Sequence, residues 1–208
     1  MAERDFFESE ARKRVGAAVE DIESGTSAEV VVTVRRRAGH YRQTDLYAGA
    51  GLALVMLVFL LFDEHPFDVR WMPVDVLVAF FIGAVVTSNT PALRRLLTSP
   101  RVLAESARTA ARAAFYDLGI SRTTGRTGIL VFVSMFERRV IVVGDVAIDP
   151  KTLGPEWQVM EGALQGSLAP PDLERFLAAM VTMKTPLARA LPIQPDDVNE
   201  LPNEPVMP

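Results

Sequence analysis

The sequence contains no cysteine, and His40 and His65 are its only histidines. Without cysteine the chain can form neither disulfide bonds nor thiolate metal sites, although this absence does not identify a compartment. No serine lies in a nucleophile elbow, and no glycine-rich phosphate loop is present. The first residues include no apolar stretch after their charges, so we do not expect a secretory signal. The sequence therefore offers no recognisable catalytic motif.

Charge of neither sign dominates the chain. The 22 Lys and Arg residues oppose 26 Asp and Glu residues, which gives a formal net charge of -4. The basic residues cluster beside two apolar segments, not along a strand with interleaved aromatic side chains, and this distribution does not predict a nucleic acid partner. Basic residues next to a membrane suit anionic lipid headgroups. We therefore expect membrane lipids, and no nucleic acid, among the partners.

Two short apolar segments are the most informative feature of the chain. Tyr47–Phe62 carries no charge, and Val74–Ser88 carries only Asp75. A helix needs about 20 mostly apolar residues to span a bilayer, and each segment approaches this length when its flanks are included. Both faces of each segment are apolar, whereas a surface helix of a soluble domain has a single apolar stripe. Residues 46–90 are therefore predicted to form a transmembrane helical hairpin, with a re-entrant hairpin and a buried helical pair as alternatives.

The charges around this hairpin predict its orientation. An excess of Lys and Arg in short flanks marks the cytoplasmic side of a membrane. The flanks contain Arg35, Arg36, Arg37, Arg42, Arg94, Arg95 and Arg101. The link between the two segments contains Asp63, Glu64 and Asp68 against Arg70. We therefore expect a multi-pass membrane protein with both termini in the cytoplasm and the two histidines on opposite sides.

The remaining residues predict one discontinuous α/β domain, residues 1–45 with 96–190, and a proline-rich C-terminal arm, residues 191–208. Continuous β-branched and apolar runs predict strands at Glu29–Val34, Gly128–Met135 and Arg139–Val143. Helical spacing of apolar residues predicts helices over Glu3–Ser24, from Pro100 to Leu118, and from Pro155 and Leu173 onward. The order of elements favours parallel pairing of the first two strands and antiparallel pairing of the third. The predicted fold class is α/β, a three-layer sandwich with a small mixed sheet that the hairpin interrupts.

Two stretches of the sequence resemble the TPM domain family. They are TGILVFVSMFERRVIVVGDVAI (Thr127–Ile148), followed by Trp157, and DDVNELP (Asp196–Pro202). The likeness covers the whole chain and is closest to the membrane-protein branch, in which a helical hairpin interrupts the domain. The resemblance implies an α/β/α sandwich. It also implies the activities attributed to relatives, which are calcium binding, weak acid phosphatase activity, photosystem repair and service as accessory subunits of membrane proteins.

One position departs from many TPM domains. They carry Asp or Asn just before the glycine that opens the second strand, whereas Arg126 and Thr127 precede Gly128 here. The resemblance therefore does not carry a calcium site over to this chain. Many relatives are also exported, in contrast to the cytoplasmic domain expected here.

Three carboxylates are the candidate metal ligands. Asp145 and Asp149 flank the end of the third strand, and Asp117 ends the helix before the second strand. Calcium takes about six to eight oxygen ligands, so backbone carbonyl groups would have to complete such a site. The alternative is that these residues cap and solvate turns, because Asp-Pro commonly opens one. No catalytic residue is predicted, and calcium is the one cofactor that the residues bring into consideration.

Four further polar positions have alternative roles. Glu137–Arg139 is expected in a solvated turn, or to bind an anion or lipid phosphate. The polar residues 123–127 are expected to form a connection, or to cradle phosphate through backbone N–H groups. Asp75 is expected at the start of its helix, where the helix dipole favours a carboxylate, or as a functional intramembrane group. Asn199–Pro202 is expected to tie the arm to the domain, or to serve as a peptide ligand.

These features together predict a non-catalytic protein. We expect a membrane-anchored TPM-like domain that acts as an interaction or accessory module at the cytoplasmic membrane face, with a protein partner or further copies of itself in the membrane. A metal-dependent phosphatase of low activity is one alternative, but it would need converging carboxylates to hold a metal and activate water. An anionic-lipid-binding membrane organiser is the other.

Overall fold

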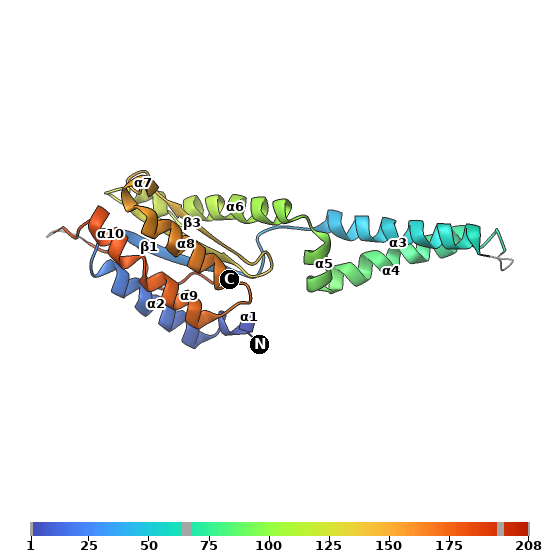
Figure 1. The fold of residues 1–208 in the computed structure, drawn as a ribbon, viewed down its shortest axis with the longest axis horizontal. Coiled ribbons are helices and arrows are strands. Elements are labelled where there is room, and N and C mark those ends of the chain that lie inside the picture. The colour runs from blue at the N-terminus through green and yellow to red at the C-terminus, as the bar shows by residue number, and fades with distance from the viewer. Residues whose placement is uncertain (1, 64–67, 195–197, 208) are drawn as a thin grey trace. The chain divides into compact units, whose positions relative to one another are not determined.

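The computed structural model describes residues 2–63, 68–194 and 198–207. They divide into two compact units. The sheet unit comprises Met1–Ala38 and Ala104–Pro208, and the hairpin unit comprises Gly39–Leu103. The fold is mixed α/β, as predicted (Figure 1).

The sheet unit contains a three-stranded mixed sheet in the order β1-β2-β3. Its strands are β1 (Glu29–Arg35), β2 (Gly128–Ser134) and β3 (Arg139–Gly144). β1 pairs in parallel with β2, so that Val31 lies opposite Leu130. About 90 residues lie between the two strands in the sequence. β2 pairs antiparallel with β3 through the tight turn at residues 135–138. Both predicted pairings are therefore confirmed.

Helices accompany the strands in both units. Those of the sheet unit are α1 (Ala2–Asp5), α2 (Ser9–Glu23), the short 3-10 helix η1 (Ile120–Arg122), α7 (Pro150–Leu153), α8 (Pro155–Gly166), α9 (Leu173–Val181) and α10 (Lys184–Ala190). Those of the hairpin unit are α3 (Arg42–Phe62), α4 (Met72–Asn89) and α5 (Pro91–Leu97). One helix, α6 (Pro100–Asp117), begins in the hairpin unit and continues in the sheet unit.

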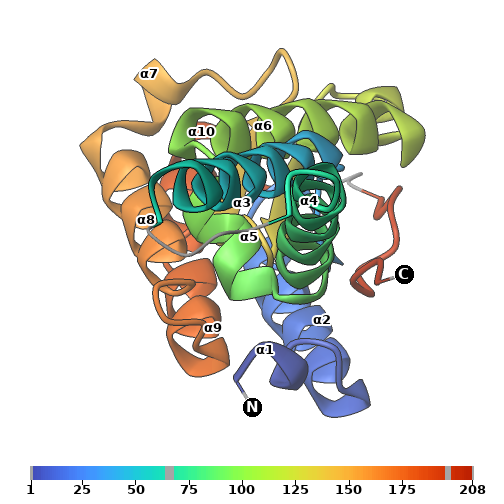
Figure 2. The same cartoon turned by 90° about the vertical axis from the view of Figure 1, so that its right-hand side faces the viewer.

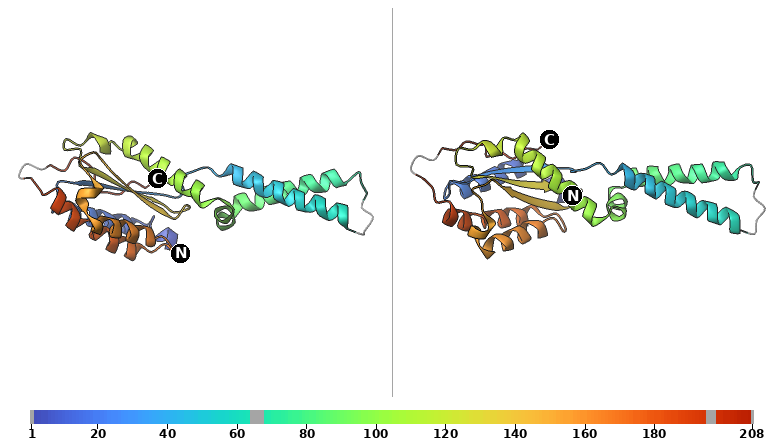
Figure 3. Two further views of the ribbon diagram at one scale, coloured as in Figure 1. Left: turned by 45° about the horizontal axis from the view of Figure 1, so that its top comes forward. Right: turned by 90° about the horizontal axis from the view of Figure 1, so that it is seen from above.

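The two faces of the sheet carry separate apolar clusters. Alternate side chains of β1 and β2, such as Val32 and Val131, pack with α2, α8, α9 and α10. Side chains at the intervening positions, such as Val31 and Leu130, pack against the alanine-rich face of α6. Figure 3 shows α6 in green on one side of the sheet and the blue and orange helices on the other. Helices on both faces explain why the strands are continuous apolar runs.

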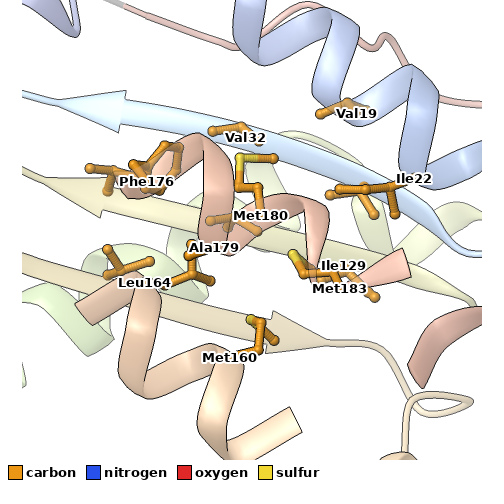
Figure 4. Packing of buried hydrophobic residues seen from close by; sticks show 14 of the residues in the cluster. Val19, Ile22, Val32, Ile129, Met160, Leu164, Phe176, Ala179, Met180 and Met183 are labelled. Carbon is orange, nitrogen blue, oxygen red and sulfur yellow. The ribbon is translucent and has the colours of Figure 1, made fainter. Parts of the chain in front are cut away.

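The larger cluster lies between the sheet and the helices α2, α8 and α9. Figure 4 shows Ile22 of α2 and Met180 of α9 close to Val32 and Ile129 of the sheet. The side chains of Ile22, Ile129 and Met180 are fully buried. Each buried side chain of this size stabilises the fold by about 1.5–3 kcal/mol relative to an exposed one. The sheet unit therefore has a core of its own that does not depend on α3 or α4.

The hairpin unit is built on α3 and α4, which pack against each other (Figure 1). Figure 2 shows the two helices close to end-on. Two glycines allow this close approach. A Cβ atom at Gly49 would lie 2.7 Å from the Phe80 carbonyl oxygen, and one at Gly83 would lie 3.0 Å from the Ala48 carbonyl oxygen. Both distances are shorter than side chains tolerate, so larger residues at these two positions would push the helices apart.

The structure corrects three helix predictions. Glu3–Ser24 is not one helix, because the chain breaks after Asp5 and turns Phe6 into the core, where its ring lies 5.6 Å from that of Phe176. The helix that begins at Leu173 does not continue to Leu187 but ends at Val181. Pro186 lacks an N–H group, which is tolerated because it lies in the first turn of the next helix, α10. The short helices α5 and α7 were not predicted.

The unit boundaries also differ from the expected residues 46–90. The hairpin unit begins at Gly39 and ends at Leu103, because α5 packs against α3. The Arg94 guanidinium donates to both carboxylate oxygens of Asp45 at 2.8 and 2.7 Å. This ion pair fastens α5 to the first turn of α3.

Candidate functional site

A cavity of about 690 Å³ lies in the sheet unit, at the amino ends of β1 and β2. We call it the Glu29 cavity. Its wall includes Ser27 and Glu29, the loop between η1 and β2, and the start of the C-terminal arm near Leu191 and Glu200. The cavity therefore joins three parts of the chain that are far apart in the sequence.

Two glutamates of this cavity bind backbone N–H groups. The Glu29 carboxylate is buried and accepts from the N–H groups of Glu200 at 3.3 Å and Leu201 at 3.2 Å. The Glu200 carboxylate accepts from the Thr124 N–H group at 3.1 and 3.0 Å and from its hydroxyl group at 3.2 Å. These bonds tie the arm to the domain, which confirms the role predicted for Asn199–Pro202; the neighbouring Asp196 lies outside the described residues.

The threonine-rich connection is engaged by the protein itself. The Thr124 N–H group binds Glu200, and the Arg126 N–H group donates to the Thr123 carbonyl at 3.1 Å. Two of the N–H groups that would have to cradle a phosphate are thus already used. These residues therefore form a connection, as expected, and their bonds also support the cavity wall.

Asp145, the first candidate metal ligand, is a buried residue at the end of β3. Its Oδ1 atom lies 2.9 Å from an Arg126 guanidinium nitrogen and accepts from the Val146 N–H group at 2.7 Å. Its Oδ2 atom is buried and has no hydrogen-bond partner within the described part of the chain. Arg126, two residues before Gly128, therefore neutralises a carboxylate here.

The other two candidates do not form a metal-binding group with Asp145. The Asp149 carboxylate caps α7 by accepting from the Lys151 N–H group at 2.9 Å. Asp117 is the exposed last residue of α6. Among residues 2–63, 68–194 and 198–207, no group of three or more His, Cys, Asp or Glu side chains is arranged to hold a metal ion. The structure therefore does not bring Asp117, Asp145 and Asp149 together.

The turn between β2 and β3 differs from the prediction at one residue. Glu137 is buried, with 3% of its surface exposed, and is not a solvated turn residue. Its carboxylate accepts from the Ser134 hydroxyl and, at 3.0 Å, from the Ala38 N–H group. Arg138, with a φ of 51°, remains partly exposed and lies 3.8 Å from the Glu3 carboxylate. Glu137 is buried because its carboxylate satisfies the backbone just beyond β1.

The outer edge of β1 is also occupied, by groups from the same chain. The Val30 N–H group donates to the Glu23 carboxylate at 2.8 Å. Val206 of the arm donates to the Val32 carbonyl at 2.9 Å and accepts from the Val34 N–H group at 3.2 Å. An open strand edge is a template for pairing with other chains, so these bonds protect the sheet.

A second cavity lies in the hairpin unit. It is a groove of about 680 Å³ formed by α3, α4 and α5, and its lining is almost entirely apolar. Asp75 lies in the first turn of α4, at the position expected for it. Neither the groove nor the Asp45–Arg94 pair was predicted, because the partner of a lone charge beside an apolar run cannot be read from spacing alone.

The comparisons with known proteins concern the fold alone. No protein-family model matches the sequence, and no match was found among curated proteins. The structure is similar to the NMR structure of the BA42 protein from the psychrophilic bacterium Bizionia argentinensis, with a TM-score of 0.55 and 15% sequence identity. The similarity covers 97% of this chain and 94% of that one.

Proposed function

We propose that the chain is a membrane-anchored, TPM-like accessory protein, with α3 and α4 in the bilayer and the sheet unit as a non-catalytic interaction module on the cytoplasmic side. The observation that carries the proposal is the exposed apolar surface of α3 and α4. The core of the sheet unit forms without α3 and α4, so packing against that core does not explain why these two helices are apolar.

The dimensions and burial of the two helices support a membrane location. α3 and α4 are each long and apolar enough to cross a membrane. At 21 and 18 residues they are about 32 and 27 Å long, close to a hydrocarbon thickness of about 30 Å. Only 22% and 17% of their apolar windows are buried, and Val55 is 64% exposed. A core helix of a soluble protein would be mostly buried, so lipid is the natural solvent for this surface.

The distribution of charge supports the orientation. Around the start of α3 and around α5, Arg42, Arg94, Arg95 and Arg101 outnumber Asp45. The opposite end of the hairpin carries Asp63, Glu64, Asp68 and Asp75 against Arg70. The positive-inside rule then assigns the α5 end, and with it both termini, to the cytoplasm.

A TPM-like assignment rests on the sequence resemblance and agrees with the fold. The stretch that carries the resemblance, Thr127–Ile148, forms β2 and β3, the central and outer strands of the sheet. A small mixed sheet with helices on both faces is what the resemblance implied. Accessory roles described for relatives fit a domain in which the carboxylates of the Glu29 cavity bind the chain's own backbone.

The arrangement of the acidic residues favours a non-catalytic role. Catalysis near neutral pH requires a poised acid or base, an activated nucleophile or a metal held by converging ligands. In the described residues Asp145 is paired with Arg126, and Glu29 and Glu200 bind backbone N–H groups. A low-activity metal-dependent phosphatase is the second candidate, and the observation that favours it is the unpartnered Oδ2 atom of Asp145.

Membrane extraction and affinity capture test the proposal. The intact protein is expected to remain in the membrane fraction at alkaline pH, to dissolve in detergent, and to bring a membrane partner or a second copy with it. Recovery in the soluble fraction would contradict membrane anchoring. The purified protein should hydrolyse p-nitrophenyl phosphate only at trace rates. Robust turnover that disappears in an Asp145→Asn variant would establish the phosphatase instead.

A further inference from the structure

The groove of the hairpin unit borders the contact that holds α3 and α4 together, and Gly83 belongs to both. Gly49 and Gly83 lie in that contact, where an added Cβ atom would meet the facing backbone. Gly51 belongs to the groove, and no atom beyond its chain neighbours and the nearby backbone of α3 lies within 4 Å of the place where its Cβ would be. Packing of the hairpin therefore does not require Gly51, and the space beside it is open.

The lining of the groove runs from α5 along the two long helices. Leu93 and Leu97 of α5 form one part of the wall, and Val55 and Ile82 lie on α3 and α4. A volume of about 680 Å³ falls within the range of about 300–1,000 Å³ that is typical of small-molecule sites. The shape and apolar lining suit a flexible hydrocarbon chain.

The residues around α5 and the start of α3 are rich in arginine, and we call this part of the hairpin unit its basic end. The Asp45–Arg94 pair and a 3.0 Å hydrogen bond between the hydroxyl groups of Thr44 and Thr98 fix α5 beside the start of α3. Arg42 and Arg101 are exposed close to these residues in the sequence. One aspartate opposes four arginines in this part of the hairpin unit, so an anionic group is attracted to it.

We propose that the groove binds an anionic phospholipid, with one acyl chain beside Gly51 and the phosphate group near Arg42 and Arg101. This inference rests on the membrane location proposed above. It adds to membrane anchoring a defined binding site for an anionic lipid. The apolar lining fits the acyl chain, and the basic end complements the headgroup.

A second copy of the chain fits the groove less well. Copies inserted in the same orientation would place their arginine-rich ends next to each other, and like charges in contact oppose association. An anionic lipid neutralises the same arginines. Charge therefore distinguishes the two occupants in favour of the lipid.

The test uses the full chain, purified in a neutral detergent and mixed with phosphatidylglycerol or phosphatidylcholine, with native mass spectrometry as the measurement of bound lipid. The Gly51→Leu variant adds a side chain in the groove lining, at a position where a Cβ atom has open space. Its matched control is Ala50→Leu, which places the same side chain at the neighbouring exposed position outside the groove lining. The Arg42→Gln and Arg101→Gln variants remove charge at the basic end.

The parent chain and Ala50→Leu are expected to bind phosphatidylglycerol in preference to phosphatidylcholine. Gly51→Leu should lose this binding, and each arginine variant should weaken it by about fivefold. Equal binding of both lipids by the parent, or unchanged binding by Gly51→Leu, would overturn the inference while leaving membrane anchoring intact. Loss of dimers in Gly51→Leu with unchanged lipid binding would assign the groove to a second copy. Failure of the parent to enter membranes would instead remove the proposed function.

Discussion

At the scale of single residues, several charged side chains in this protein act as internal supports. Glu29 and Glu137 are both buried, and each accepts hydrogen bonds from backbone N–H groups in a distant part of the chain. The buried Asp45 carboxylate pairs with Arg94 in the hairpin unit. A buried charge is tolerated only when it is paired or hydrogen-bonded, so the loss of one partner affects more than a local contact.

The Glu29→Ala variant is expected to release the C-terminal arm. Two backbone N–H groups, those of Glu200 and Leu201, would lose their acceptor, at a cost of about 1–3 kcal/mol. Limited proteolysis should then cleave the arm faster than in the parent. Glu204→Ala, at an exposed position of the same arm, is the control and should change the cleavage rate little. Equal protection of the arm in all three chains would refute the role given to Glu29.

The Leu130→Asp variant tests the centre of the sheet. Leu130 is fully buried against α6, and an unpaired carboxylate there costs several kcal/mol, about as much as a domain can lose. We expect the variant not to accumulate as folded protein. Leu130→Ala removes the side chain without adding a charge and should lower stability by about 2–5 kcal/mol. If Leu130→Asp melted at the temperature of the parent, the core assignment would be wrong.

At the scale of helices and strands, the sequence predicted the elements with continuous or periodic apolar patterns. The strand runs at Glu29–Val34 and Gly128–Met135 could be identified because strands buried on both faces are continuously apolar. The alanine-rich face of α6 could be identified because a helix buried on one face shows a periodic apolar stripe. The short helix α5 could not, because seven residues are too few to show a period. The break at Phe6 was missed because only tertiary packing turns this residue inward.

Candidate-site residues were harder to predict than elements. Asp145 and Asp149 lie at the end of β3, as their positions in the sequence suggested, but their partners are Arg126 and the α7 backbone. Glu29 was not recognised because it is simply the first residue of an apolar strand. Its role depends on a hydrogen bond from the Glu200 N–H group, 171 residues later in the chain. Sequence spacing does not contain such long-range contacts. His65, predicted to lie on the opposite side of the membrane from His40, is outside the described residues.

The arm's contact with β1 leads to a prediction about association. Val206→Pro removes the N–H group that donates to the Val32 carbonyl at 2.9 Å, whereas Val206→Ala keeps it. Exposure of this edge should cause self-association in Val206→Pro and not in Val206→Ala. Light scattering of the detergent-solubilised proteins measures the difference. Identical masses for the two variants would show that the arm does not protect the edge.

An ion pair between α2 and α9 gives a pH-dependent contribution to stability. The hydrogen bond from Arg14 lowers the pKa of Glu174 below its usual value, and the attraction of the Arg14 charge adds to this effect. A carboxyl group with a lowered pKa stabilises the fold above its unfolded pKa, and the contribution is lost as the pH falls through the folded pKa. The parent should therefore melt slightly higher than Glu174→Gln at neutral pH, and the difference should vanish in acid. A difference that persisted below the folded pKa would contradict this assignment.

At the scale of the whole molecule, the chain combines a self-sufficient sheet unit with a helical hairpin whose surface is mostly exposed and apolar. The sheet unit covers both faces of its sheet with its own helices and the outer edge of β1 with groups of the same chain, so its main apolar clusters lie inside. The hairpin unit carries the opposite character, with arginines concentrated at the α5 end. This division of roles is what an anchored module at a membrane surface requires.

The measurement that tests this account most directly is cysteine labelling in intact cells, for which a chain without cysteine gives no background. The Asp68→Cys variant places a cysteine at the exposed end of the hairpin opposite α5. The Gln43→Cys variant places one at an exposed position in the first turn of α3. A membrane-impermeant maleimide should label Asp68→Cys from outside and should reach Gln43→Cys only after the cells are permeabilised. The proposed orientation would be contradicted if Gln43→Cys were labelled from outside while Asp68→Cys was protected. A spanning hairpin would be contradicted if both variants were protected until the cells were permeabilised.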